Sequence, residues 1–132
     1  MEISSLDGHY RITLASNVFE LNPGAYDFGT ASVVLINGNF TGTDDGNIKW
    51  SGEVFLENPE TPNDISIILL LDPANAPPDA YIVQPDGSFA RTTTEHNLKM
   101  RLIRHNDDVR LIGTIEIGQV SIEASVSRVG NL

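Results

Sequence analysis

The sequence contains no cysteine, which excludes a disulfide framework, a thiolate nucleophile and a thiolate metal site. It also lacks the basic and apolar segments of an export signal in its first residues, which read MEISSLD. The longest apolar run, residues 65–71, is interrupted by Ser66 and is far too short to span a bilayer. We therefore expect a cytoplasmic protein that is neither exported nor embedded in a membrane.

Basic residues are scarce. The chain carries 8 Lys and Arg against 18 Asp and Glu, a formal net charge of −10, which argues against nucleic acid and anionic membranes as partners. Residues 1–90 contain only Arg11 and Lys49 as bases, whereas residues 91–132 contain six bases and five acids. The last third could present a local basic face, although strands that simply show mixed charge to solvent are the simpler interpretation.

Helical spacing of apolar residues is scarce too, and the dominant pattern is the alternation of apolar and polar residues that is typical of strands with one buried face. The alternation predicts strands over residues 9–14, 31–36, 39–43, 48–57, 65–71, 81–83, 96–105, 109–117 and 120–126. Hairpin turns are expected at Asn37-Gly38, at residues 44–47 and at Gly118-Gln119, and a loop is expected at Asn22-Pro23-Gly24.

Eight or nine short strands joined by tight turns favour one all-β domain over residues 1–132, an antiparallel up-and-down barrel. A parallel sheet is excluded because the sequence offers no crossover helices. Gly42, Gly52 and Gly113 interrupt strands, which predicts places where the sheet bends and neighbouring backbones approach closely.

No catalytic motif is present, and we expect a non-enzymatic protein without cofactor or metal. His96 and His105 lie at opposite ends of one predicted strand, about 30 Å apart when it is extended, so they cannot share a metal within one chain. We interpret His9, His96 and His105 as surface residues near turns. Glu53 and Glu57 share a polar strand face about 13 Å apart, too far for a glycosidase pair.

A barrel of about eight strands encloses either packed side chains or one small molecule. The aromatic residues Trp50, Phe40, Phe55, Phe89 and Tyr81 could line such a pocket for an apolar ligand, although a packed core is the better interpretation. If the interior is hollow, the candidate ligand-binding residues are Tyr10, Phe40, Trp50 and Met100.

The strand at residues 65–71 is apolar at nearly every position, so its outer face must meet something besides the barrel interior. A second copy of the protein and the segment Pro73 to Pro78 are both candidates. Together with the partly acidic loop before it, this strand gives a candidate partner-binding set, namely Glu57, Glu60, Asp64, Ile68 and Leu70.

The segment Asp27 to Gly52, DFGTASVVLINGNFTGTDDGNIKWSG, resembles the GrlR-like family of bacterial negative regulators of type III secretion genes. Residues 6–12, LDGHYRI, and residues 120–128, VSIEASVSR, are similar to that family's first and last strands. The resemblance implies a lipocalin-like, calycin-type barrel that forms homodimers and, in the named regulator, binds a transcriptional activator protein. The family's acidic Glu-Asp-Glu-Asp loop corresponds here to residues 57–64, which are longer, contain proline and are only partly acidic.

Two functions follow as expectations. The first is a regulatory or protein-interaction protein that acts as a homodimer or on a protein partner. The alternative is a carrier that binds a small apolar ligand inside the barrel.

Overall fold

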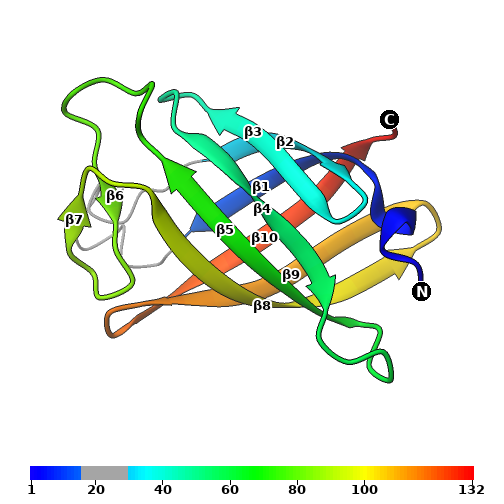
Figure 1. Cartoon of the computed structure of the whole chain (residues 1–132). Helices are drawn as coiled ribbons and strands as arrows, with labels where there is room; N and C mark the ends of the chain where they lie inside the picture. The colour runs from blue at the N-terminus through cyan, green and yellow to red at the C-terminus, as the bar shows by residue number, and fades with distance from the viewer. Residues whose placement is uncertain (16–29) are drawn as a thin grey trace.

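The computed structural model describes residues 1–15 and 30–132, which form ten β-strands and one short 3-10 helix (Figure 1). In chain order the elements are η1 (Ile3–Leu6), β1 (Gly8–Ala15), β2 (Thr30–Ile36), β3 (Asn39–Asp44), β4 (Lys49–Leu56), β5 (Asp64–Asp72), β6 (Ile82–Val83), β7 (Phe89–Ala90), β8 (Thr94–His105), β9 (Asp108–Ile117) and β10 (Val120–Gly130). The loop predicted at Asn22-Pro23-Gly24 lies outside the described residues, as do residues 27–29 of the segment that resembles the GrlR-like family. No helix in the described ranges combines the length and apolar character needed to cross a membrane.

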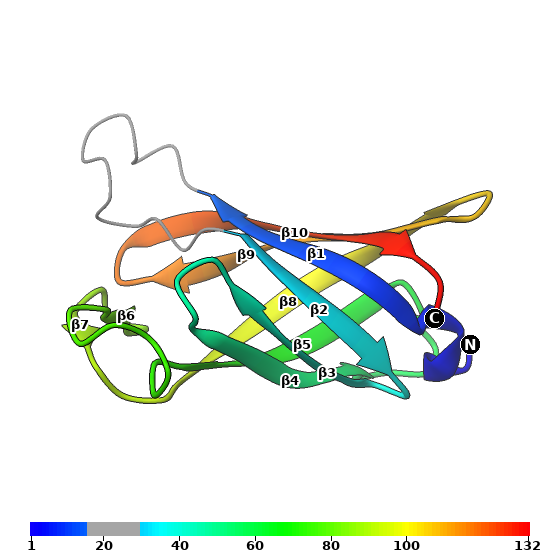
Figure 2. The same cartoon turned by 90° about the horizontal axis from the view of Figure 1, so that it is seen from above.

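Eight of the strands form a closed antiparallel barrel in the order β1-β10-β9-β8-β5-β4-β3-β2. Each barrel strand pairs with the barrel strands that precede and follow it in the chain, and β10 returns to pair with β1. This arrangement confirms the predicted up-and-down barrel of about eight strands. The remaining strands, β6 and β7, pair with each other and lie at one end of the barrel, whereas η1 and both chain termini lie at the other end (Figures 1 and 2).

The period-two alternation read from the sequence determines which side chains fill the barrel. In β8, alternate residues from Thr94 to Leu102 are buried, while the residues between them are exposed. The same alternation continues around the barrel and gives one hydrophobic cluster with Tyr10, Ile12, Val33, Trp50, Leu69, Leu98, Leu111, Ile122 and Val126 among its members. Burial of these apolar side chains is the main favourable contribution to folding.

Both ends of the barrel are covered by segments that sequence patterning did not assign to the core. At one end η1 brings the buried Leu6 onto the barrel, and the Tyr10 hydroxyl donates a hydrogen bond to the Leu6 carbonyl oxygen at 2.5 Å. At the other end β6 supplies the buried Ile82 and Val83 to the same core cluster. The predicted short strand near residues 81–83 is therefore outside the barrel sheet and serves to cover its end.

The three predicted hairpin turns form, including Gly118-Gln119 between β9 and β10. Asn37 and Gly38 both have positive φ, as a two-residue turn between β2 and β3 requires. The turn after β3 is organised by Asp44, whose Oδ1 accepts hydrogen bonds from the backbone N–H groups of Gly46 and Ile48 at 2.9 and 3.0 Å. The other oxygen of this carboxylate accepts the Trp50 indole N–H at 2.9 Å, so Asp44 both shapes the turn and satisfies the polar atom of a fully buried side chain.

The glycines in β3 and β4 are places where strands approach closely, as predicted. Across these two strands Gly42 pairs with Trp50 and Gly52 pairs with Phe40, so a large ring lies beside each glycine. A Cβ atom added to Gly52 would lie 1.8 Å from the Ile68 carbonyl oxygen of β5, and one added to Gly42 would lie 1.9 Å from the Ser32 carbonyl oxygen of β2. Neither position can accept a side chain without movement of the backbone.

We therefore predict that Gly52→Ala lowers the free energy of unfolding by at least about 2 kcal/mol, because the added methyl group meets backbone that cannot rotate away. The matched control is Gly46→Ala in the exposed turn, where the nearest atom is 3.4 Å away and a change within about 1 kcal/mol is expected. Urea unfolding followed by Trp50 fluorescence measures both variants. Equal stability of Gly52→Ala and the parent protein would contradict the close packing.

Candidate functional site

The interior of the barrel holds the four candidate ligand-binding residues, and all of them belong to the packed core. Tyr10, Phe40, Trp50 and Met100 are buried. Tyr10 and Phe40 border an apolar space of about 20 Å³, also lined by Leu6, Ile12, Val33, Leu35, Val54, Ile67, Leu111 and Val126. Small-molecule pockets typically measure about 300–1,000 Å³, so this part of the interior has room for about one water molecule.

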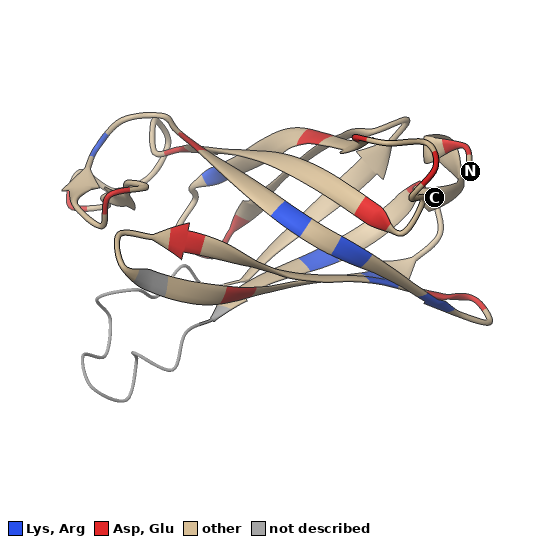
Figure 3. Ribbon diagram, turned by 90° about the horizontal axis from the view of Figure 1, so that it is seen from below, with Lys and Arg blue, Asp and Glu red and all other residues tan. Residues whose placement is uncertain are grey.

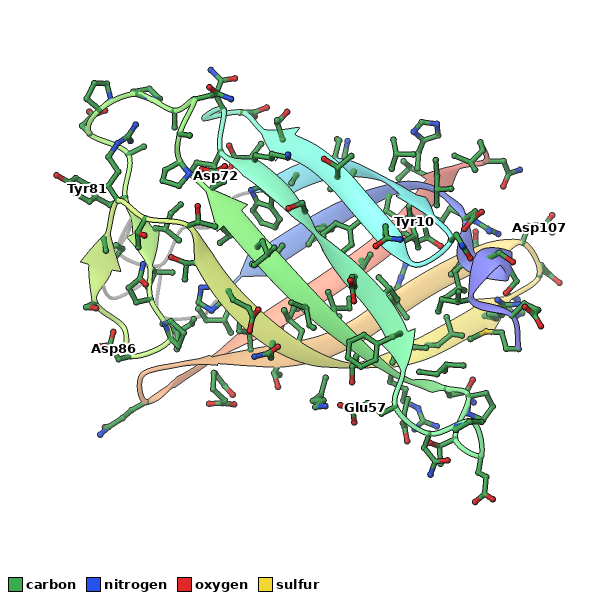
Figure 4. The ribbon with its side chains drawn as sticks, in the orientation of Figure 1. Tyr10, Glu57, Asp72, Tyr81, Asp86 and Asp107 are labelled. Carbon is green, nitrogen blue, oxygen red and sulfur yellow. The ribbon has the colours of Figure 1, made fainter. Side chains whose placement is uncertain are left out.

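Three of the aromatic residues considered for an interior pocket lie elsewhere. Phe55 is on the outward-facing side of β4 and is only half-buried. Tyr81 and Phe89 are 58% and 53% exposed at the β6–β7 end, and Figure 4 shows Tyr81 directed away from the barrel. The expectation that these three residues line an interior pocket is wrong. Tyr81 and Phe89 lie outside because residues 73–93 leave the barrel between β5 and β8, and Phe55 points outward because it follows the inward-facing Val54 in β4.

His96 corrects the interpretation of all three histidines as surface residues. His9 and His105 are exposed, but His96 is only 2% exposed and shares the inward face of β8 with Leu98 and Met100. Its Nε2 donates a hydrogen bond to the Val83 carbonyl oxygen at 2.9 Å, which ties β6 to the end of the barrel. Burial lowers the pKa of the His96 imidazole below its ordinary value, and the hydrogen bond to Val83 opposes this shift only in part.

The candidate partner-binding residues follow the outer face of β5 and the loop before it. Asp64, Ile68 and Leu70 point outward from alternate positions of β5, with Ser66 between them. Ile68 is flanked in register by Glu53 and Asn97, and both Ile68 and Leu70 are half-buried. Within a single chain, the apolar outer face of β5 is thus only partly covered.

The loop between β4 and β5 is a defined turn. The Asn58 side chain accepts a hydrogen bond from the Glu60 backbone N–H at 2.9 Å, and the Asn58 carbonyl oxygen accepts one from the Thr61 N–H at 3.1 Å. The Asn63 carbonyl oxygen accepts the Leu102 N–H at 2.7 Å, which fixes the loop to β8. Glu60 is exposed on this loop.

Lys99 of β8 links the loop to the outer face of β5. Its ammonium group forms an ion pair with Glu57 and donates a hydrogen bond to the Ser66 hydroxyl at 3.1 Å. The hydrogen bond from Lys99 lowers the pKa of the Glu57 carboxyl below its ordinary value, and Ser66 contributes in the same direction. Because both charged side chains are more than half exposed, the pair stabilises the fold little and remains available to a partner.

These groups border a surface groove of about 400 Å³, and Glu57 in Figure 4 marks the end of β4 beside it. The groove is lined by Glu57, Asp64, Ile65, Ser66, Lys99, Met100, Arg101 and Ile112. Two predicted residues, Glu57 and Asp64, are brought together here, whereas Ile68 and Leu70 continue along β5 and Glu60 stays on the loop. Sequence reasoning missed Lys99, Arg101 and Ile112; the alternation in β8 and β9 gave their outward direction, but only the strand order places them beside β5.

The described residues contain no group of three or more His, Asp or Glu side chains placed to hold a metal ion. The chain matches no model of a known protein family and no curated protein.

The burial of His96 predicts a pH-dependent stability. A histidine whose folded-state pKa lies below its unfolded value of about 6.5 stabilises the fold above that pH, and this contribution is lost as the pH falls through the folded-state pKa. We expect the free energy of unfolding to decrease as the pH is lowered from about 7 to about 5. The decrease should be smaller in His96→Gln. His105→Gln, at an exposed position of the same strand, is the control and should keep the parent slope. Urea unfolding across this pH range measures the free energy of unfolding of all three proteins. Parallel curves of this free energy against pH for the parent and His96→Gln would contradict the role of the buried His96.

Proposed function

We propose that this chain is a non-enzymatic regulatory protein that works by binding another protein through the outer wall of its barrel. The binding surface consists of the groove beside β5 together with Ile68, Leu70 and Glu60. The observation that carries the proposal is the outer face of β5, where aliphatic side chains and exposed charges lie together on a rigid wall.

The chemistry of this surface suits a protein partner. Protein interfaces combine an apolar centre with a polar rim, and they favour surfaces that are rigid before binding. Here Ile68 and Leu70 supply aliphatic area, while Glu57, Asp64 and Lys99 supply charges at one end of it. The loop that carries Glu60 is held by backbone hydrogen bonds, so little conformational entropy is lost when a partner docks.

The resemblance to the GrlR-like family supports the same proposal. It extends the proposal to a cytoplasmic regulator that forms a homodimer and acts on a regulatory protein. The homodimer would form through the outer face of β5, because a second copy would cover the half-buried Ile68 and Leu70 symmetrically.

The alternative of an apolar-ligand carrier has less support. The space around Tyr10 and Phe40 is too small for a lipid-sized molecule, and both ends of the barrel are covered by apolar side chains of η1 and β6. A ligand would have to displace Leu6, or Ile82 and Val83, from the core.

A site-specific photo-crosslinking experiment in native cells tests the proposal. The photoreactive residue p-benzoylphenylalanine replaces Leu70 on β5, and in the control it replaces Ser32, which is exposed on β2, three strands away around the barrel. We expect a discrete protein adduct from position 70 and none from position 32. An adduct of twice the 14.4 kDa chain mass would identify a second copy as the partner.

Charge reversal then examines the rim of the same surface. Glu57→Lys combined with Asp64→Lys should reduce the adduct from position 70 several-fold, because both carboxylates border the groove. The proposal fails if position 70 gives no protein adduct, or if positions 70 and 32 give the same adducts.

A further inference from the structure

The outer wall formed by β8 and β9 carries two isoleucines and two arginines in alternation. Arg101 of β8 lies opposite Ile112 of β9, and Ile103 of β8 lies opposite Arg110 of β9. Ile103 and Ile112 are 44% and 42% exposed, and both arginines are exposed. The four side chains therefore form one patch, here called the Arg-Ile patch, in which each aliphatic group lies directly across from a guanidinium.

Neither guanidinium of this patch is used by the fold. Within residues 1–15 and 30–132, Arg101 and Arg110 form no ion pair or hydrogen bond, although Asp64 of β5 is the register partner of Arg101. Three of the other four arginines are engaged: Arg91 donates to backbone carbonyls of residues 76, 77 and 80, Arg104 donates to Ser5, and Arg128 donates to the Asp107 carbonyl. The fourth, Arg11 of β1, has no such partner among the described residues and lies across Ser127 from Arg110. The free donors of the patch are thus available to an external acceptor.

The charge of the patch is opposite to that of the molecule. The chain has a net charge of −10, but on the side shown in Figure 3 the Lys and Arg segments gather along β8 and its neighbouring strands. Asp64 and Asp108 are the acids nearest in register or sequence, at the borders of the patch. The wall is locally basic around Arg101 and Arg110, but Glu95, Glu116 and Glu123 on the outward faces of β8, β9 and β10 give the wall as a whole the mixed charge that is the simpler interpretation of the composition.

The geometry of the barrel restricts how a partner can bind here. Arg101, Arg110 and Ile112 each have a strand partner on both sides, so a partner strand cannot add to the sheet at these residues, whereas Ile103 lies beyond the last β5–β8 pair. Recognition must use side chains that point away from the wall. Next to the patch, β10 presents only Ser125 and Ser127, whose small side chains leave the surface flat.

A protein segment suits this patch better than a nucleic acid. Nucleic-acid surfaces combine extended positive charge with aromatic side chains on which bases stack, and the outward positions of β8 and β9 carry no Phe, Tyr or Trp. Aliphatic side chains between guanidiniums match an extended partner that alternates aliphatic groups with carboxylates along one face, that is, at every second residue.

We infer that the Arg-Ile patch binds an extended acidic segment of the partner protein, with its carboxylates on Arg101 and Arg110 and its aliphatic side chains on Ile103 and Ile112. This inference rests on the proposed function and specifies the chemistry of the partner. The patch adjoins the groove beside β5, since Arg101 and Ile112 line both, so one partner can contact the two surfaces together.

Fluorescence anisotropy with synthetic probes tests the inference on the full chain. The main probe is a labelled dodecapeptide with three repeats of glutamate-serine-leucine-serine, which puts glutamate and leucine on the same face of an extended chain; the comparison probes replace leucine by serine, or glutamate by lysine, and a thymidine oligonucleotide of the same length represents nucleic acid. The variant is Arg101→Glu with Arg110→Glu. Its matched control is Lys49→Glu with Arg91→Glu, which makes the same change in net charge at exposed positions outside the β8–β9 wall. Thermal unfolding checks that both variants remain folded.

We expect the glutamate-leucine peptide to bind the parent protein, more weakly as salt is added. Arg101→Glu with Arg110→Glu should weaken this binding at least about tenfold, while the control pair should change it much less. Equal loss in both variants, no binding by the parent, or equally tight binding of the oligonucleotide would overturn the inference. Self-association of the chain that is lost in Arg101→Glu with Arg110→Glu would instead assign the patch to a second copy. A protein adduct from position 70 without peptide binding would leave the proposed function intact and refute only this inference.

Discussion

The pairing of β1 with β10 is the interaction on which the rest of the structure depends. In this pairing Ile12 lies opposite Val126 and Leu14 opposite Ala124, which joins the first strand of the chain to the last. With it, every barrel strand has two hydrogen-bonded neighbours and no edge is left to attract other chains. Without it, the sheet would be open, and its alternating apolar face would need cover from outside.

Closure of the barrel explains why the candidate binding surfaces lie on its outer wall. A cylinder of eight strands leaves space inside for side chains of ordinary size, and here the rings of Phe40 and Trp50 lie beside Gly52 and Gly42 because the barrel wall leaves room for no more. With η1 and β6 covering the two ends, the charged groups lie on the outer wall. The outer face of β5 and the Arg-Ile patch consist of the outward-facing residues of the same alternating strands.

Much of this fold could be predicted from the sequence because period-two alternation and Asn-Gly turns are local signals. Nearness to a turn does not determine the position of His96; its spacing of two from Leu98 and four from Met100 puts it on the inward face of β8. Local signals could not show that Ile82 and Val83 cover the barrel end, since that depends on the path of residues 73–93. The groove likewise depends on strand order, because the order of the strands brings Glu57, just after β4, beside Lys99 of β8.

Amide hydrogen exchange of β1 and β10 tests closure most directly. In a closed barrel the paired amides of these two strands open only with the global transition, so their protection should be within about tenfold of that in β5 and β8. If β1 and β10 were instead the edges of an open sheet, their outward amides would exchange orders of magnitude faster than those of β5 and β8. The first result is the one predicted by a closed and filled barrel, and the second would contradict it.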